Sequence, residues 1–123
     1  MARVLALVPD LLFGSQVQGM LAAAGDEVEL VGDGDRVRDR LVNAAAPAVD
    51  VLVVDLTTDA LDGPALIEAL SADGALAQTR TLGFYAHVDV SVRERAEQAG
   101  FDLVVPRSRM SREGAELVRR VAD

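Results

Sequence analysis

The chain has 123 residues, half of them apolar, and a formal net charge of −8. This length suits a single domain, residues 1–123, and the excess of acid opposes nonspecific binding to nucleic acid or to an anionic membrane. Cysteine is absent, which excludes disulfides, thiol catalysis and thiolate metal sites. The opening apolar run is interrupted by Pro9 and Asp10, too soon for a signal peptide or a membrane span, so we expect a soluble, cytoplasmic protein.

Strand and helix patterns alternate through the first half of the chain. Pro9 stops the first strand, Gly25 suits the left-handed residue after a helix, and Pro47 ends the second helix. Asp35 or a neighbour is expected to cap that second helix. In chain order the predicted elements are strand 4–8, helix 12–24, strand 28–31, helix 35–46 and strand 51–54.

The same alternation continues through the second half. Pro64 suits the first turn of a helix, and the segment from Ser91 to Glu94 has the spacing of a capping box. Ser111 is the expected cap of the last helix, whose apolar residues follow helical spacing. In chain order the predicted elements are helix 64–70, strand 81–86, helix 91–100, strand 103–105 closed by Pro106, and a final helix from Ser111.

Five consecutive strand–helix units predict an α/β fold. Parallel strands joined by helical crossovers bury both faces of their sheet, with helices packed on each side. We therefore expect a doubly wound, five-stranded parallel sheet of (βα)5, flavodoxin-like architecture.

The run from Val51 to Asp55 is a buried-strand pattern that ends on a carboxylate. Open α/β sheets place their chemistry at the carboxyl ends of strands, which makes Asp55 the first candidate site residue. A lone acid at a strand end is also commonly an ordinary turn residue. Thr57 and Thr58 are expected either to bond the Asp55 carboxylate or to satisfy the loop backbone, and the Asp62-Gly63 pair predicts a turn in which glycine supplies a positive φ.

Three segments together resemble the receiver domain of two-component response regulators, the CheY-like family, over essentially the whole chain. Asp55 to Gly63 resembles the phosphoacceptor strand and its following loop. Leu82 to His87 is similar to the next strand of the family, and Arg93 to Phe101 to its fourth helix and the glycine after it. The resemblance implies a protein of intracellular signal transduction that is not itself an enzyme.

The resemblance also implies roles for single positions. In this family a phosphoryl group moves from a histidine kinase to an Asp, and Mg²⁺, a Lys and a small hydroxyl neutralise the developing charge. The acceptor position falls on Asp55, the hydroxyl position on Tyr85 and the Lys position on Arg107.

The candidate Mg²⁺ ligands are Asp10 and Asp55. Val8 and Pro9 stand where the family has its acidic pair, and Asp10 follows directly. Mg²⁺ prefers carboxylates and water in octahedral geometry, so Asp10 contributes only if its carboxylate turns inward. The competing interpretation is that Asp10 caps the first helix or lies in solvent.

Tyr85 and Arg107 each have alternatives. The Tyr85 ring carries its hydroxyl past the site, lies over Asp55, or packs at the strand end with its hydroxyl in water. Arg107 keeps the charge of Lys, but its planar fork favours paired contacts with a carboxylate; it forms an ion pair with Asp55 or is a solvated surface residue. The family's cis peptide, if kept, falls at Val105–Pro106. His87, the only histidine, is interpreted as a solvated loop residue.

Three functions are consistent with these residues. The favoured one is a stand-alone, atypical receiver-like domain that acts by protein–protein contact, with impaired or absent Asp phosphorylation. The second is a working phosphoacceptor receiver that a histidine kinase phosphorylates on Asp55. The third is a small flavodoxin-like hydrolase or ligand-binding protein, although the phosphate-binding and dinucleotide-binding glycine motifs are absent.

The favoured function needs a docking face for a signalling partner or for a second copy. We expect it on the helix at 91–100, the strand at 103–105 and the final helix, which together carry charges of both signs suited to specific pairing. No nucleic-acid or membrane partner is expected. The charged residues of this face are Arg93, Arg95, Glu97, Arg107, Arg109, Arg112, Glu113 and Glu116.

Overall fold

The computed structural model describes residues 1–86 and 88–123. Strands and helices alternate along it, as the sequence predicts. The elements are β1 (Arg3–Leu7), α1 (Leu11–Ala23), β2 (Glu27–Val31), α2 (Gly34–Val42), β3 (Val51–Asp55), α3 (Gly63–Ala72), β4 (Arg80–Tyr85), α4 (Val90–Ala99), β5 (Leu103–Pro106) and α5 (Arg107–Ala122).

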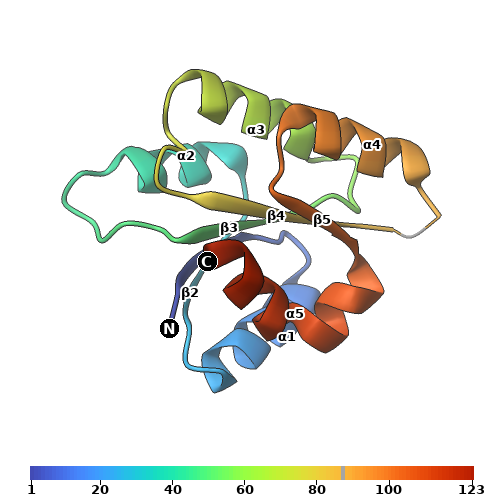
Figure 1. The fold of residues 1–123 in the computed structure, drawn as a ribbon, viewed down its shortest axis with the longest axis horizontal. Coiled ribbons are helices and arrows are strands. Elements are labelled where there is room, and N and C mark those ends of the chain that lie inside the picture. Colours follow the sequence, from blue (N-terminus) through green and yellow to red (C-terminus); the bar gives the residue numbers. More distant parts are fainter. Residues whose placement is uncertain (87) are drawn as a thin grey trace.

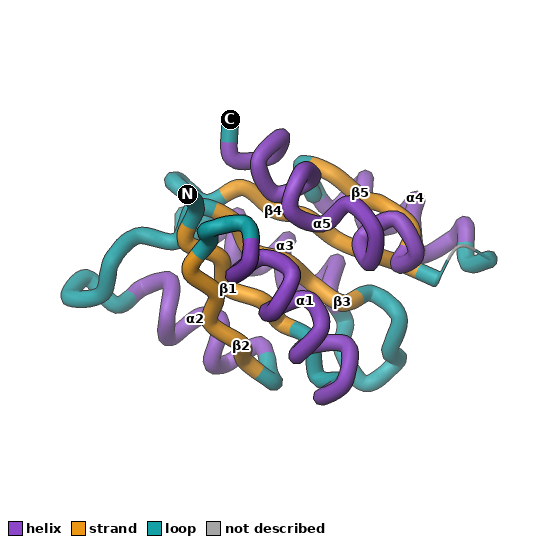
Figure 2. Tube along the Cα trace, turned by 90° about the horizontal axis from the view of Figure 1, so that it is seen from below, coloured by secondary structure: helices purple, strands orange, loops and turns teal. Residues whose placement is uncertain are grey.

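The strands form one parallel sheet in the order β2-β1-β3-β4-β5. Helices α1 and α5 cover one face, and α2, α3 and α4 cover the other (Figure 1). Seen from below, α1 and α5 lie side by side across the near face (Figure 2). The predicted doubly wound α/β fold is confirmed.

Alternation of side chains along the strands divides the core in two. Successive strand residues point to opposite faces, so β3 contributes Val51 and Val53 to one core and Leu52 and Val54 to the other. The first core packs against α1 and α5, and the second against α2, α3 and α4. The three interior strands are apolar on both faces because both faces are covered.

Four of the five helices begin with an Asp cap. Each of these carboxylates accepts a hydrogen bond from the backbone N–H three residues further on, which satisfies a donor that the helix itself leaves unpaired. The capping residues are Asp10, Asp33, Asp62 and Asp89.

The predicted serine caps were wrong. Ser91 is the second residue of α4, where its hydroxyl donates to the capping Asp89 at 3.0 Å. Ser111 lies inside α5, which begins four residues earlier at Arg107, directly after Pro106 and with no side-chain cap. Pro106 already has an extended backbone at φ −62° and ψ 147°, so the chain turns into α5 without a separate capping loop.

Two smaller expectations were also wrong. Helix α2 ends at Val42 rather than at residue 46, because Asn43 takes an extended backbone and its side chain accepts from Ala45 N. Gly63 is the first residue of α3, and its φ is not positive. Glycine is needed there for space, since a Cβ would lie 2.5 Å from Leu56 Cδ2. Among the described residues every peptide bond is trans, that before Pro106 included.

At the amino-terminal edge of the sheet, three aspartates join neighbouring strands. Each carboxylate accepts from a backbone N–H at or beside the start of another strand. The pairs are Asp26 with Ala2 N at 2.9 Å, Asp50 with Arg3 N at 2.8 Å and Asp102 with Thr81 N at 2.8 Å.

No helix within the described residues is long and apolar enough to cross a membrane.

Candidate functional site

Asp55 lies at the carboxyl end of the central strand, as predicted. It pairs in register with Phe84 of β4, and the next backbone N–H, of Leu56, donates to the Phe84 carbonyl at 2.8 Å. Its side chain is only 3% exposed. The hydrogen bonds between β3 and β4 thus hold Asp55 at the carboxyl-terminal edge of the sheet, where the β1–α1, β3–α3 and β4–α4 connections converge.

The Asp55 carboxylate is held by its own loop. Oδ1 accepts from Thr57 N at 2.8 Å and from Thr57 Oγ1 at 2.6 Å. Oδ2 receives no hydrogen bond from any of the described residues. Of the two threonines considered from sequence, Thr57 bonds the carboxylate, while Thr58 Oγ1 accepts from Ala60 N at 3.3 Å within the loop.

Asp10 caps α1 rather than facing Asp55. Its Oδ1 accepts from Phe13 N at 3.1 Å, and its Oδ2 lies 3.9 Å from Arg107 Nη2. Mg²⁺ requires carboxylate oxygens free to enter an octahedral shell. Asp10 Oδ1 is taken up by the helix cap and Oδ2 lies beside the Arg107 cation, and no group of three or more His, Cys, Asp or Glu side chains among the described residues is arranged to hold a metal. In this arrangement Asp10 and Asp55 do not fit a Mg²⁺ site.

Arg107 faces α1 instead of Asp55. Its guanidinium carbon lies 4.2 Å from the centre of the Phe13 ring, in the geometry of a cation–π contact. Phe13 in turn packs on Phe84 with ring centres 5.1 Å apart. Arg107 opens α5 on the same sheet face as α1, so the first turn of α1 supplies its partners, and the ion pair that the structure shows is with Asp10 rather than with Asp55.

Tyr85 packs at the end of β4 on the opposite face of the sheet. It is 6% exposed and belongs to the same apolar cluster as Ala96 of α4 and Phe101. Its neighbour Phe84, which pairs with Asp55, belongs to the cluster on the α1–α5 face. The Tyr85 hydroxyl, followed by Glu97, raises the pKa of the exposed Arg93 guanidinium on α4. The ring of Tyr85 thus packs at the strand end, as one of the three alternatives has it, but its hydroxyl acts on the Arg93 guanidinium rather than lying simply in water.

Two features of this site were missed from the sequence. Phe13 was not considered as a partner of Arg107, because the two are brought together only by the packing of α1 against α5. The Asp caps at the carboxyl edge were largely missed too, although an Asp shortly before each helical pattern was a usable signal. His87 lies outside the described residues.

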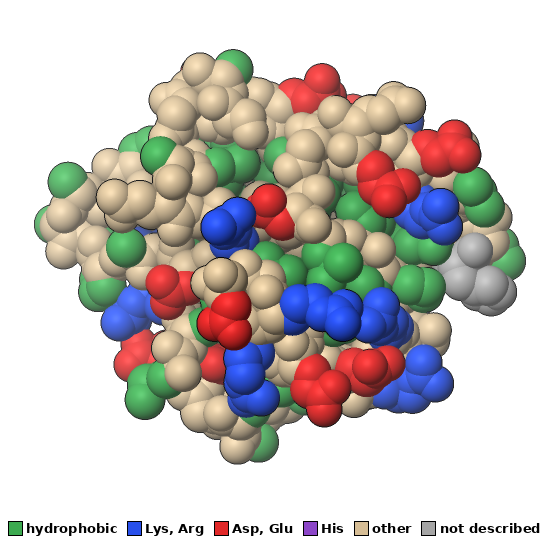
Figure 3. Space-filling view, viewed as in Figure 1, with side chains coloured by type: hydrophobic (Ala, Val, Ile, Leu, Met, Phe, Trp, Pro, Cys, Tyr) green, Lys and Arg blue, Asp and Glu red, His purple; other side chains and the backbone are tan. Residues whose placement is uncertain are grey.

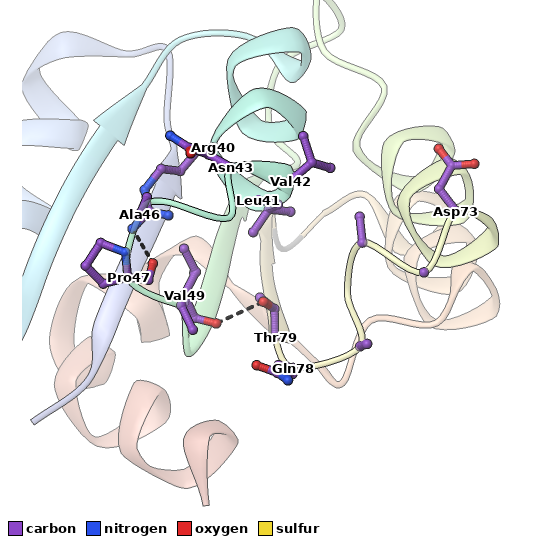
Figure 4. A pocket seen from close by; sticks show the side chains of 14 residues that line it. Arg40, Leu41, Val42, Asn43, Ala46, Pro47, Val49, Asp73, Gln78 and Thr79 are labelled. Carbon is purple, nitrogen blue, oxygen red and sulfur yellow. Dashed lines mark hydrogen bonds between the residues drawn. The ribbon is translucent and has the colours of Figure 1, made fainter.

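The opposite edge of the sheet carries a hollow of about 330 Å³ between the α2–β3 and α3–β4 connections (Figure 4). Its charged side chains are already paired: Arg40 with Glu29 at 2.8 Å, and Asp73 with Arg38. Arg40 also donates to the Pro47 carbonyl, and Thr79 Oγ1 donates to Val49 O. These contacts fix the connecting loops and leave no nucleophile–base arrangement in the hollow.

Comparison with solved structures identifies the fold. A putative response regulator from Chloroflexus aurantiacus superposes with a TM-score of 0.86 at 18% identity, covering 98% of this chain and 97% of that one. The chemotaxis response regulator CheY4 of Vibrio cholerae gives 0.80 at 21% identity, with 98% of each chain covered.

The signal receiver domain of the putative response regulator NarL from Mycobacterium tuberculosis gives 0.78 at 24% identity, over 98% of this chain and 95% of that one. No protein-family model and no curated protein sequence matches the chain. The chain has the fold of the response regulator receiver domains, the CheY-like architecture that its sequence resembles.

Proposed function

We propose that the chain acts as one receiver-like signalling unit that works through protein–protein contact and does not depend on phosphorylation of Asp55. The observation that carries the proposal is that the groups at the phosphorylation positions are committed to other contacts. Asp10 caps α1 and pairs with Arg107, and Tyr85 lies in the core of the other sheet face.

Phosphoryl transfer needs positive charge at the oxygens where negative charge develops. Arg107 is stacked on the Phe13 ring, and the carboxylate with which it forms an ion pair is that of Asp10 rather than that of Asp55. The Asp10 carboxylate, its second oxygen held near that cation, is a poor ligand for Mg²⁺. These contacts favour a site in which the side chains of Arg107 and Asp10 stabilise the start of α1 and do not bind a phosphoryl group or a metal ion.

The partner face that we propose lies on α4, β5 and α5. Its exposed residues carry charges of both signs, including the pairs Arg93–Glu97 at 3.4 Å and Arg109–Glu113 at 3.5 Å. Basic and acidic side chains are interspersed over the part of the surface where α5 lies (Figure 3). Such patterned charge selects partners more than it strengthens binding.

The second candidate is a working phosphoacceptor. It is favoured by one observation, that Oδ2 of Asp55 receives no hydrogen bond from the described residues while Oδ1 is held by Thr57. This oxygen is the one that would take a phosphoryl group from a histidine kinase acting as donor.

Incubation with Mg²⁺ and either acetyl phosphate or beryllofluoride separates the two candidates. We expect treatment to leave the intact mass and the amide spectrum unchanged, both for the wild-type protein and for Asp55→Asn, with a phosphorylatable receiver domain as positive control. A phosphoryl adduct or a spectral change that Asp55→Asn abolishes would favour the working phosphoacceptor and contradict the phosphorylation-independent function.

A second experiment measures the association that the proposal requires. We expect a concentration-dependent dimer, or a complex with a signalling protein, that persists in Asp55→Asn when measured by sedimentation velocity. A protein that stays monomeric at all concentrations and forms no partner complex would contradict the proposal.

A further inference from the structure

Gly114 lets α1 and α5 come close at the point where α5 bends. Glu113, directly before it, has a non-helical backbone with φ −125° and ψ 17°. A Cβ on Gly114 would overlap the methyl group of Met20, and it would lie 3.3 Å from Met20 Sδ and 3.2 Å from Met110 Cε. The thioether of Met20 therefore fills the space that glycine leaves open, against the backbone of the bend.

The three methionines of the chain differ in exposure. Met1 is 96% exposed and Met110 is fully buried, whereas Met20 is partly exposed. Met20 lies one helical turn after Gln16, whose Nε2 donates to Ser111 Oγ at 3.3 Å, so both side chains lie where α1 meets α5 near the surface. Met20 thus lies against a neighbouring helix and is also within reach of solvent.

The thioether is the sulfur group that this chain offers to an oxidant, because cysteine is absent. Hydrogen peroxide converts a thioether to a sulfoxide. A lone pair on Sδ attacks one peroxide oxygen, the O–O bond breaks, and the hydroxide that leaves takes the proton of the transferred oxygen to give water. The sulfur loses two electrons and the peroxide gains them. An apolar group is thereby replaced by a polar one, which is costly to bury without hydrogen-bond donors.

We propose that Met20 is a redox-sensitive contact, through which reversible oxidation by peroxide changes the position of α5 against α1. A sulfoxide is bulkier and more polar than a thioether, and methyl groups of Met20 and Met110 already fill the space beside Gly114. Oxidation therefore loosens this contact. The bend at Glu113 is where α5 yields, because the helix is already interrupted there.

The inference deepens the proposed function, on which it rests only for its consequence. Arg109 and Glu113, paired at 3.5 Å on the proposed partner face, lie in the part of α5 that bends. A change at the bend therefore alters the arrangement of charges on that face. Methionine sulfoxide is reduced enzymatically, so the change is reversible.

The test treats the isotope-labelled full chain with hydrogen peroxide and locates the added oxygen by mass spectrometry of peptides. We expect Met20 to be oxidised at least about tenfold faster than Met110, because peroxide does not reach a buried sulfur. The amide shifts measured by NMR should then change in α1 and α5, most strongly near Glu113 and Gly114, with the fold retained. Methionine sulfoxide reductases should restore both the mass and the spectrum.

Three variants locate the effect. Met20→Leu keeps an apolar side chain of similar volume that peroxide does not oxidise, so its α5 shifts should not change on treatment. Met110→Leu is the matched control, since it removes the other methionine at Gly114 and should respond as the wild type does. Met20→Gln places a polar group at the contact and should reproduce the shifts without peroxide.

Stability gives a second measurement. Oxidation of Met20 should raise the ratio of unfolded to folded protein at least about fivefold in urea denaturation, because a polar group is then held in an apolar contact. The same treatment should leave this ratio unchanged in Met20→Leu.

The proposal is overturned if Met110 is oxidised as fast as Met20, if oxidation of Met20 leaves the α5 shifts unchanged, or if Met20→Leu responds to peroxide as the wild type does. Loss of the fold on oxidation also overturns it, because a switch needs both states to be folded. None of these outcomes involves Asp55 or a partner, so the redox contact and the proposed function can fail independently.

Discussion

At the amino-terminal edge of the sheet, Asp26, Asp50 and Asp102 accept hydrogen bonds from backbone groups 21 to 47 residues away in the sequence. At the carboxyl-terminal edge, Asp10, Asp33, Asp55, Asp62 and Asp89 accept from N–H groups only two or three residues further on. Aspartate side chains therefore join neighbouring strands at the amino-terminal edge and stabilise individual loops and helix starts at the carboxyl-terminal edge.

This difference bears on the candidate site. A carboxylate that bonds the backbone of its own turn loses little conformational entropy when it is ordered. It is also less available as a ligand for a metal ion. The carboxyl edge, where open α/β sheets place their chemistry, is thus occupied by aspartates that stabilise their own loops and helix starts. Asp55 is distinguished among them by burial, at 3% exposure, rather than by a different kind of partner.

The largest effect is expected at the amino-terminal edge. Asp102→Ala removes the acceptor of both Thr81 N and Thr81 Oγ1, and Thr81 is 2% exposed. Because a buried donor is left unpaired, the free energy of unfolding should fall by about 1–3 kcal/mol, measured by urea denaturation. Asp102→Asn keeps an acceptor oxygen and should lose less; equal losses for the two variants would contradict this account.

A local cap at the carboxyl edge should matter less. Asp62→Ala removes the acceptor for Ala65 N at the start of α3 and should lower the free energy of unfolding by about 1 kcal/mol. The same denaturation assay on Asp62→Ser, which restores a capping oxygen, should recover most of the loss. A loss larger than that of Asp102→Ala would break the contrast between the two edges.

Arg107 tests the link between α1 and α5. Arg107→Ala removes the contact with the Phe13 ring, and its half-exposed pair with Asp10 adds little at 3.9 Å. We expect a loss of about 0.5–1 kcal/mol in the free energy of unfolding. Arg120→Ala, on the exposed side of the same helix, is the control and should be nearly neutral. If Arg107→Ala changes the free energy of unfolding as little as the control does, the stacked guanidinium makes no measurable contribution to stability.

The smallest effect is expected at Asp55 itself. Asp55→Asn keeps the Oδ1 that accepts from Thr57 N and Thr57 Oγ1, so the free energy of unfolding should change by less than about 0.5 kcal/mol. Thermal and urea denaturation of the two proteins in parallel check this. A loss above that of Asp62→Ala would mean that the negative charge of Asp55 is itself needed by the fold.

The sequence by itself determined those features that depend on residues close together in the chain. The alternation of apolar strand and helix patterns predicts the parallel sheet, and the run ending at Asp55 predicts an acid at the carboxyl edge; the structure has both. Gly25, with φ of 95° directly after the α1 cap, and Pro64 in the first turn of α3 also lie as expected. Each of these features depends on residues a few positions apart, whose preferences are set by backbone sterics.

Tertiary packing decided the rest. Whether Arg107 faces Asp55 or Asp10 depends on which helix lies beside the start of α5, and the packing of α1 there selects Asp10 and Phe13. The face taken by Tyr85 depends on the register of β4 against β3, which assigns Phe84 to the Asp55 side. These contacts join residues 29 to 97 positions apart, and no local pattern encodes them, because the groups meet only once the sheet and both helix layers have formed.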